Sequence, residues 1–201
     1  MKKAKFALKI TALISVVFFF FSCNPLENTS QSNTLLVVLQ ILGTDIEDNA
    51  VEFLQSDVVK VDADTGLVYV VADSATVSLK AQIVDPSSEA QASFYNDIMV
   101  TRYVVSYSRA DGNNQPGVDI PYSFEGSLST LIPIGSSTEI SFIIIREVAK
   151  MEPPLYSLAI GRDEGVLQVT AKVEFYGHDM ANNKVKGTGY LAIFFANYTD
   201  S

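Results

Sequence analysis

The sequence offers few side chains that could act as a nucleophile, a metal ligand or a general base. Its 201 residues include one cysteine, Cys23, and one histidine, His178. A single cysteine excludes an intramolecular disulfide framework and any zinc or iron–sulfur site built on several thiolates. A single histidine removes nearly all histidine-based metal sites and weakens a serine or cysteine triad, because the imidazole must sit beside the nucleophile.

His178 stands next to Asp179, where it could serve as a general base or, with an ordinary pKa of about 6.5, as a pH switch. The alternative is a solvated residue in the turn of a hairpin. We favour the turn, because no serine or cysteine in a nucleophile-elbow sequence is present as a partner. We therefore predict no catalytic residue and do not expect an enzyme.

Two acidic clusters could bind a cation. Asp62, Asp64 and Gly66 have the spacing that begins a calcium loop, but the position of the bidentate Glu is taken by Asp73, beyond an expected strand. A tight turn explains the same residues, and a solvated loop explains the second cluster: Asp45, Glu47, Asp48 and Glu52. We predict no metal site and no cofactor. Dispersed carboxylates leave glycoside hydrolysis open, because its acid pair need not be close in sequence.

The N-terminal residues have the order of a secretory signal. Four lysines lie in residues 1–9, Ile10–Phe21 is a mainly apolar run of twelve residues, and the small residue Ser22 follows. The competing interpretation is a transmembrane anchor. A span needs about 20 apolar residues, far more than this run provides, and polar residues follow it directly. We therefore predict that residues 1–22 are a signal peptide.

The segment Phe20-Phe21-Ser22-Cys23 resembles a bacterial lipobox. This resemblance implies that the signal is cut before Cys23 and that its thiol carries a diacylglycerol, with fatty acyl chains such as palmitate as the lipid anchor. The alternative is an incidental cysteine in an ordinary secreted protein. Asn24 is not the Asp that marks inner-membrane retention in these lipoproteins, so the resemblance implies an outer-membrane location, facing the periplasm or the cell surface.

The charge balance and the next segment fit a tethered extracytoplasmic protein. Four of the fourteen basic residues lie in residues 1–22, so residues 23–201 carry ten basic and 23 acidic side chains, a formal charge of −13. Nucleic acid is excluded as a partner, because phosphate contacts need clustered Lys and Arg. Residues 24–33, rich in Asn, Ser and Gln, are predicted to be a flexible tether after the lipidated Cys23.

The remaining residues, 34–201, have the pattern of a single all-β domain. Short apolar runs alternate with Asp, Asn, Gly and Pro turn signals, and several runs have the two-residue period of a half-buried strand. The best helical candidate is a short turn at Val148–Met151. We predict an antiparallel two-layer β-sandwich of seven to nine strands. The expected strands are Thr34–Ile41, Asp57–Val61, Leu67–Ala72, Ala75–Val84, Ile98–Arg109, Ile120–Phe124, Glu139–Glu147, Val166–Tyr176 and Lys184–Ala196.

Aromatic residues on the last hairpin suggest one binding surface. Tyr176, Tyr190 and Phe194 fall on the face opposite the predicted core residues. If this face is exposed, the rings could bind a partner or a sugar ring. The alternative, which we favour, is that both faces are covered, because apolar residues on both faces usually signal double burial.

Two further resemblances concern the fold. Residues 101–112, with Tyr103, Val105 and Tyr107 on one face before an Asp-Gly turn, resemble the third strand of fibronectin type III domains. Residues 98–197 also resemble uncharacterised envelope lipoproteins that end in an immunoglobulin-like sandwich. The fragments that carry this likeness are Gly117–Pro121, Lys150–Leu155 and Phe175–Asp179. These likenesses imply a fold and a location, but no activity.

Together these observations predict a membrane-anchored extracytoplasmic lipoprotein that binds or assembles with a protein or glycan of the bacterial cell envelope. A calcium-dependent carbohydrate binder or an extracytoplasmic hydrolase is the alternative, and a structural component without a small ligand is a third reading.

Overall fold

The computed structural model describes residues 32–62, 64–85, 93–161 and 165–198. The predicted signal peptide, Cys23 and residues 24–31 of the tether lie outside the described residues. Residues 31–201 fall into one compact unit, which we call the body. None of the helices in the described part of the chain is long and apolar enough to cross a membrane.

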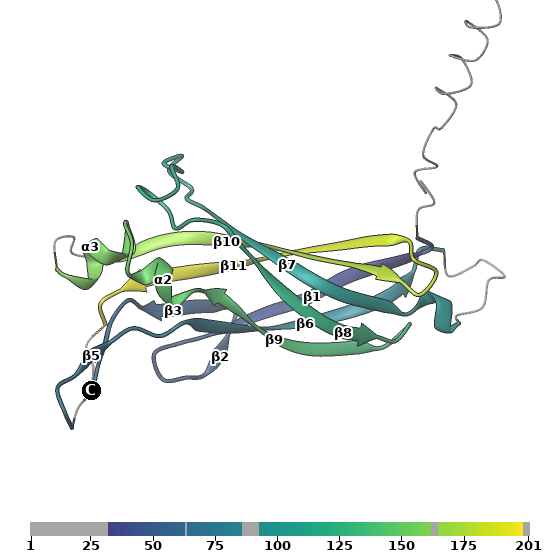
Figure 1. Ribbon diagram of the computed structural model, residues 1–201, viewed down its shortest axis with the longest axis horizontal. Helices are drawn as coiled ribbons and strands as arrows, with labels where there is room; N and C mark the ends of the chain where they lie inside the picture. Colours follow the sequence, from purple (N-terminus) through teal and green to yellow (C-terminus); the bar gives the residue numbers. More distant parts are fainter. Residues whose placement is uncertain (1–31, 63, 86–92, 162–164, 199–201) are drawn as a thin grey trace, which may run out of the picture. The chain divides into compact units, whose positions relative to one another are not determined.

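The body is a sandwich of a four-stranded and a five-stranded sheet, in the orders β2-β1-β6-β9 and β3-β11-β10-β7-β8 (Figure 1). This confirms the predicted fold class, although the described residues contain eleven strands rather than seven to nine. Seven are long: β1 (Thr34–Thr44), β6 (Asp73–Ile83), β7 (Ile98–Ser108), β8 (Phe124–Ile132), β9 (Ser137–Ile145), β10 (Leu167–Asp179) and β11 (Lys184–Ala196). The short ones are β2 (Ala50–Val51), β3 (Phe53–Asp57), β4 (Lys60–Val61) and β5 (Val68–Tyr69).

The long strands follow an immunoglobulin-like order. β1, β6 and β9 are neighbours in the order of strands A, B and E, and β7, β10 and β11 in that of strands C, F and G. β8 is added beside β7, and β2 to β5 occupy the connection between β1 and β6. The likeness of residues 101–108 to a third strand is consistent with this order, because β7 is the third long strand.

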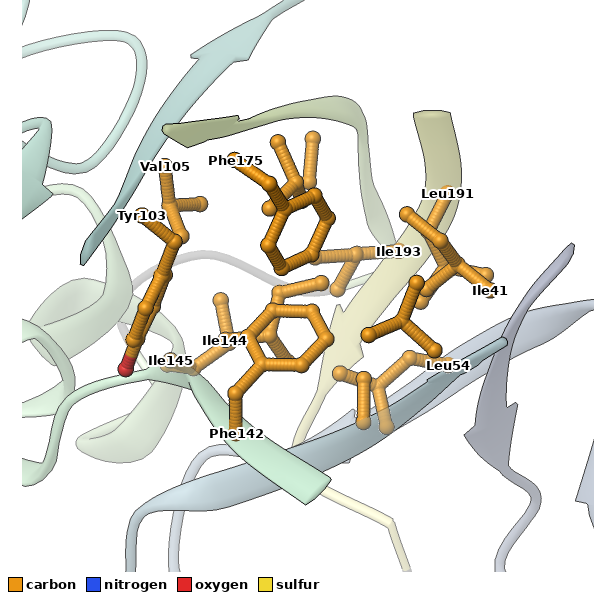
Figure 2. Close-up of a cluster of buried hydrophobic side chains, with 14 of the residues drawn as sticks. Ile41, Leu54, Tyr103, Val105, Phe142, Ile144, Ile145, Phe175, Leu191 and Ile193 are labelled. Atoms are coloured by element: carbon orange, nitrogen blue, oxygen red, sulfur yellow. The ribbon is translucent and has the colours of Figure 1, made fainter. Parts of the chain in front are cut away.

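Alternation along the strands builds the core between the sheets. Val77, Leu79 and Ala81 of β6 are fully buried, whereas Ser78 and Lys80 on the other face are not, as the period predicts. Tyr103, Val105 and Tyr107 of β7 also point inward. In Figure 2 the rings of Phe142 and Phe175 lie between the sheets near Tyr103; their centroids are 5.4 Å apart in an edge-to-face arrangement.

Several strand predictions were wrong because some residues that face the core in these strands are not apolar. β8 was missed because it places Gly126 and Thr130 on its inward-facing side. The predicted run Ile120–Phe124 contains only the first residue of β8. A Cβ on Gly126 would clash with the Tyr103 ring, so the position is kept free of a side chain. β3 was also missed, since its buried Ser56 breaks the apolar pattern. The predicted runs at 57–61 and 67–72 shrink to the two-residue strands β4 and β5.

Two inward glycines let the sheets converge at one edge. Gly187 and Gly189 of β11 face β1, and a Cβ on either would press against Leu36, Val38 or Ile41. Because no side chain intervenes, β1 packs closely along β11. On the same side, β3 joins β11 as a parallel neighbour, with Leu54 paired to Ile193.

The strand directions give the body two different ends (Figure 1). At the tether end, Ser32 precedes β1, and short connections at 133–136 and 180–183 join β8 to β9 and β10 to β11. At the distal end lie three longer connections, 45–72, 109–123 and 146–166. The last contains the helices α2 (Glu147–Lys150) and α3 (Leu155–Ala159), so the predicted helical turn at Val148–Met151 is confirmed.

Candidate functional site

His178 lies in a strand and not in the turn where it was predicted. It is the penultimate residue of β10 and pairs with Lys184 of β11 and Met99 of β7. The strand continues to Asp179 because that side chain organises the turn: its Oδ1 accepts backbone N–H groups from Ala181 and Asn183. The half-buried His178 ring places Nδ1 3.0 Å from the carbonyl oxygen of Asp179.

The acidic loops use their carboxylates for turns. Asp62 Oδ1 accepts hydrogen bonds from the backbone N–H and the hydroxyl of Thr65, each at 2.7 Å, and these lower the pKa of Asp62. Asp45 Oδ1 accepts the N–H groups of Glu47 and Asn49 in the same way. Over the described ranges, no three His, Cys, Asp or Glu side chains are grouped so as to hold a metal ion.

The hairpin aromatics lie on the outer face of the five-stranded sheet as separate rings. Tyr190 is 62% exposed, which contradicts the expectation that this face is covered. Phe194 packs edge-on against Phe53, with centroids 5.9 Å apart. Tyr190 and Phe194 are four residues apart on one strand, a separation of roughly 13 Å. The three rings therefore share a face but do not form one contiguous patch.

Tyr176 belongs to a row of charged side chains that crosses the same face. The guanidinium carbon of Arg102 lies 4.0 Å from its ring centroid, and Lys186 Nζ lies 5.3 Å away. Arg102 also pairs with Glu125, and Lys186 with Glu174. Hydrogen bonds from Lys186 and Lys172 lower the pKa of Glu174. A shallow groove of about 450 Å³ lies beside this row, over Thr101, Arg102, Tyr176, His178 and Lys184.

Many large apolar side chains are exposed in the connections at the distal end. Its three long connections expose large apolar side chains that no strand pattern requires: Leu67, Val68, Val118, Tyr122, Met151, Tyr156, Ile160 and Val166. Long connections at one end of a sandwich are the usual place for binding residues, because the sheets hold them in fixed relative positions. We therefore regard the distal end as the candidate site.

A groove of about 250 Å³ separates two of these connections. Val118 and Arg109 form one wall, and Pro154, Leu158 and Val166 form the other, with Gly165 and Leu167 completing it. Next to it is a second hollow of about 280 Å³ over Ser108–Asp111 and Val166–Thr170. The Arg109 guanidinium pairs with Asp111 at the rim. Val118, Leu158 and Val166 offer apolar contacts in a groove that also exposes polar groups and has the Arg109–Asp111 pair at its edge, a mixture that suits a side chain of a protein partner.

A buried ion pair fixes the distal connections to each other. Lys150 of α2 is 1% exposed; its Nζ donates to the carbonyl oxygen of Asp57 at 2.7 Å and to Asp73 Oδ1 at 2.9 Å. Ser56 Oγ donates to the other oxygen of Asp73. Burial raises the pKa of Asp73, although Lys150 and Ser56 oppose that rise. Because Ser56 and Lys150 are inaccessible, the cluster holds α2 against β3 and does not itself contact a ligand.

Sequence reasoning missed the distal groove and the ion pair behind it. Val118 and Val166 carry no periodic signal, and Lys150 resembles any surface lysine of a helical turn. The length of the connections was the one available signal, because 109–123 and 146–166 far exceed a hairpin turn. Comparison of the chain with protein-family models, with curated proteins and with solved structures found no match.

Proposed function

We propose that this protein is a lipid-anchored binding module of the bacterial cell envelope, held in the outer membrane through Cys23 and presenting its distal end to a partner protein. The lipobox-like segment supports the anchor. The exposed apolar side chains of the distal end support a protein partner, because exposed apolar surface is typical of protein contacts.

The difference between the two ends of the body carries this proposal. Ser32 lies where the described chain enters the body and donates a hydrogen bond to Asp179 at the tether end. The connections 45–72, 109–123 and 146–166 lie at the opposite end, and the connection 84–97 lies at the tether end. A protein held by its N-terminal lipid therefore displays its most apolar connections away from the point of attachment. The module acts by presentation: the anchor fixes the location, residues 24–33 give reach, and the distal end binds.

The outer face of the five-stranded sheet favours a second candidate partner, an envelope glycan. Tyr190 is exposed, and the Arg102–Tyr176–Lys186 row offers cations beside an aromatic ring. A sugar ring stacks on such an aromatic face, and an acidic sugar would also pair with the cations.

The anchor is tested by the intact mass of the protein extracted from its native membrane. A species that begins at Cys23 and is heavier by two or three acyl chains is expected, and a Cys23→Ser variant should lose that mass and the membrane fraction. A mature chain without lipid in the wild type would remove the anchor from the proposal.

The binding end is tested by photo-crosslinking in cells. A photoreactive amino acid is placed at Val118 or Val166 in the groove, at Tyr190 on the outer face, and at the exposed Ser127 of β8 as the matched control. We expect a discrete protein adduct from the groove positions alone. A protein adduct from Tyr190 alone would overturn the distal-end assignment, and glycan adducts there would favour the second candidate.

A further inference from the structure

Two adjacent aromatic side chains are exposed at the tether end of the body. Phe94 and Tyr95 lie in a single 3-10 turn, η1 (Phe94–Asn96), with 59% and 66% of their surface exposed. The Asn96 side chain donates to Thr34 Oγ1 at 3.3 Å, which fixes this turn beside the first residue of β1. Figure 1 shows the turn next to the start of β1.

Further apolar surface surrounds the same point. Val84 is exposed at the end of β6, and its N–H donates to the carbonyl oxygen of Asn33. Leu35 is exposed one residue after Thr34. Four exposed apolar side chains therefore lie near the point where the chain enters the body, and none of them is packed in the core.

Two carboxylates at this end are buried. Asp97 and Asp179 are buried and accept hydrogen bonds, Asp97 from the N–H of Ile134 and Asp179 from Ser32 and its own turn. These two carboxylates are therefore turned into the body, so they add little to the repulsion that anionic head groups would exert on this surface.

The tether limits how far this end can lie from a membrane. Ser32 is nine residues after Cys23 in the sequence, and an extended chain covers at most about 3.6 Å per residue, or roughly 32 Å over this distance. The thirteen residues of β10 alone span about 43 Å along the body. An acylated Cys23 would therefore keep the tether end within about 32 Å of the bilayer, less than the length of β10.

We propose that the tether end rests on the lipid surface, with Phe94 and Tyr95 inserted at the level of the head groups. This inference rests on the proposed anchor and adds an orientation to it. Aromatic side chains prefer that layer, because their apolar rings and polar edges match its two sides. The contact holds the long axis of the strands away from the membrane plane and keeps the distal groove clear of lipid.

The absence of tryptophan from the chain makes a direct test available. The full-length acylated protein is purified as a Tyr95→Trp variant and, separately, as a Tyr156→Trp variant in α3 at the distal end, where Tyr156 is also exposed. Both are reconstituted into phosphatidylcholine vesicles with bromine near the head-group end of the acyl chains. We expect loss and a blue shift of tryptophan emission for Tyr95→Trp and unchanged emission for Tyr156→Trp. A Phe94→Ser change added to Tyr95→Trp should reduce the quenching.

The mass of each sample separates the two proposals. If the protein carries its acyl chains and floats with the vesicles, but Tyr95→Trp is not quenched, the orientation is wrong while the anchor stands. Equal quenching of both variants would mean that the body lies on its side, which also overturns the orientation. If no acyl chains are present, the anchor fails, and the orientation fails with it.

Discussion

At the scale of single residues, Lys150 is the position that we expect to tolerate substitution least. Its ammonium group is buried among Asp73, Ser56 and the carbonyl of Asp57. Removing one partner of a buried pair leaves the other charge uncompensated. We therefore predict that Lys150→Ala lowers the free energy of unfolding by about 3–5 kcal/mol at pH 7, measured by urea denaturation.

The same variant should respond to pH in a defined direction. Burial already raises the pKa of Asp73, and without Lys150 the main opposing group is gone. Because the native pKa lies above the unfolded one, protonation of Asp73 favours the folded variant, and that contribution is lost as pH rises through the native pKa. The deficit of Lys150→Ala should shrink between pH 7 and pH 5, and Asp73→Asn in the same chain should restore stability at pH 7. A deficit independent of pH would mean that water reaches Asp73.

Gly126 is a second residue whose identity is dictated by a neighbour. A Cβ there would meet the ring of Tyr103, which packs edge-to-face on Phe142 with centroids 5.1 Å apart. We predict that Gly126→Ala destabilises the fold by about 1–3 kcal/mol through overpacking, whereas Ser127→Ala on the exposed face of the same strand has little effect. In a Tyr103→Leu background, Gly126→Ala should destabilise the fold less, because the ring is absent. If the two changes destabilise the fold additively in thermal melts, residues 103 and 126 do not touch.

At the scale of elements, the β10–β11 hairpin depends on one carboxylate. Burial raises the pKa of Asp179. Hydrogen bonds from Asn183, Ser32 and Ala181 lower it by more, so the pKa lies below its ordinary value. Because the native pKa is the lower one, ionised Asp179 stabilises the fold above about pH 4, and this contribution is lost as pH falls through the native pKa.

The matching experiment compares wild type and Asp179→Asn by urea denaturation from pH 2 to pH 7. We expect the variant to lose about 1–3 kcal/mol near neutrality, where charge-assisted hydrogen bonds are lost, and to converge with the wild type in acid. Asn183→Ala should shift the acid loss of stability to higher pH, because Asp179 then has fewer donors. If the free energy of unfolding of wild type and of Asp179→Asn changes with pH in parallel, Asp179 is not the origin of the acid sensitivity.

The elements also show what the sequence could and could not predict. β11 was predicted with its observed bounds and β10 nearly so, because Val169 and Val173 alternate with polar residues and a clear turn separates the two strands. β8 could not be found this way, since Gly126 faces inward to accommodate a ring that lies far away in the sequence. The distal groove was beyond reach for the same reason: Val118 and Leu158 meet only after the sheets have placed their connections together.

At the scale of the whole molecule, two electrostatic effects oppose each other. Residues 23–201 carry a formal charge of −13, which destabilises the compact state through self-repulsion. The outer-face ion pairs Arg102–Glu125 and Lys186–Glu174 act in the other direction, but exposed pairs of this kind contribute less than about 1 kcal/mol each. The long-range repulsion sums over many carboxylates, so it should outweigh the pairs.

We therefore predict that sodium chloride stabilises a protein of residues 23–201 against thermal unfolding. Raising the salt from low concentration to 0.1 M shortens the screening length to about 10 Å, which weakens repulsion across the body more than contacts between adjacent side chains. A gain of about 1 kcal/mol would raise Tm by roughly 2–4 °C for a domain of this size. The gain should shrink near pH 4.5, where carboxylates begin to protonate and the net charge falls. A Tm that decreases with salt at pH 7 would show instead that the charged row around Tyr176, and not the net charge, dominates the electrostatic contribution to stability.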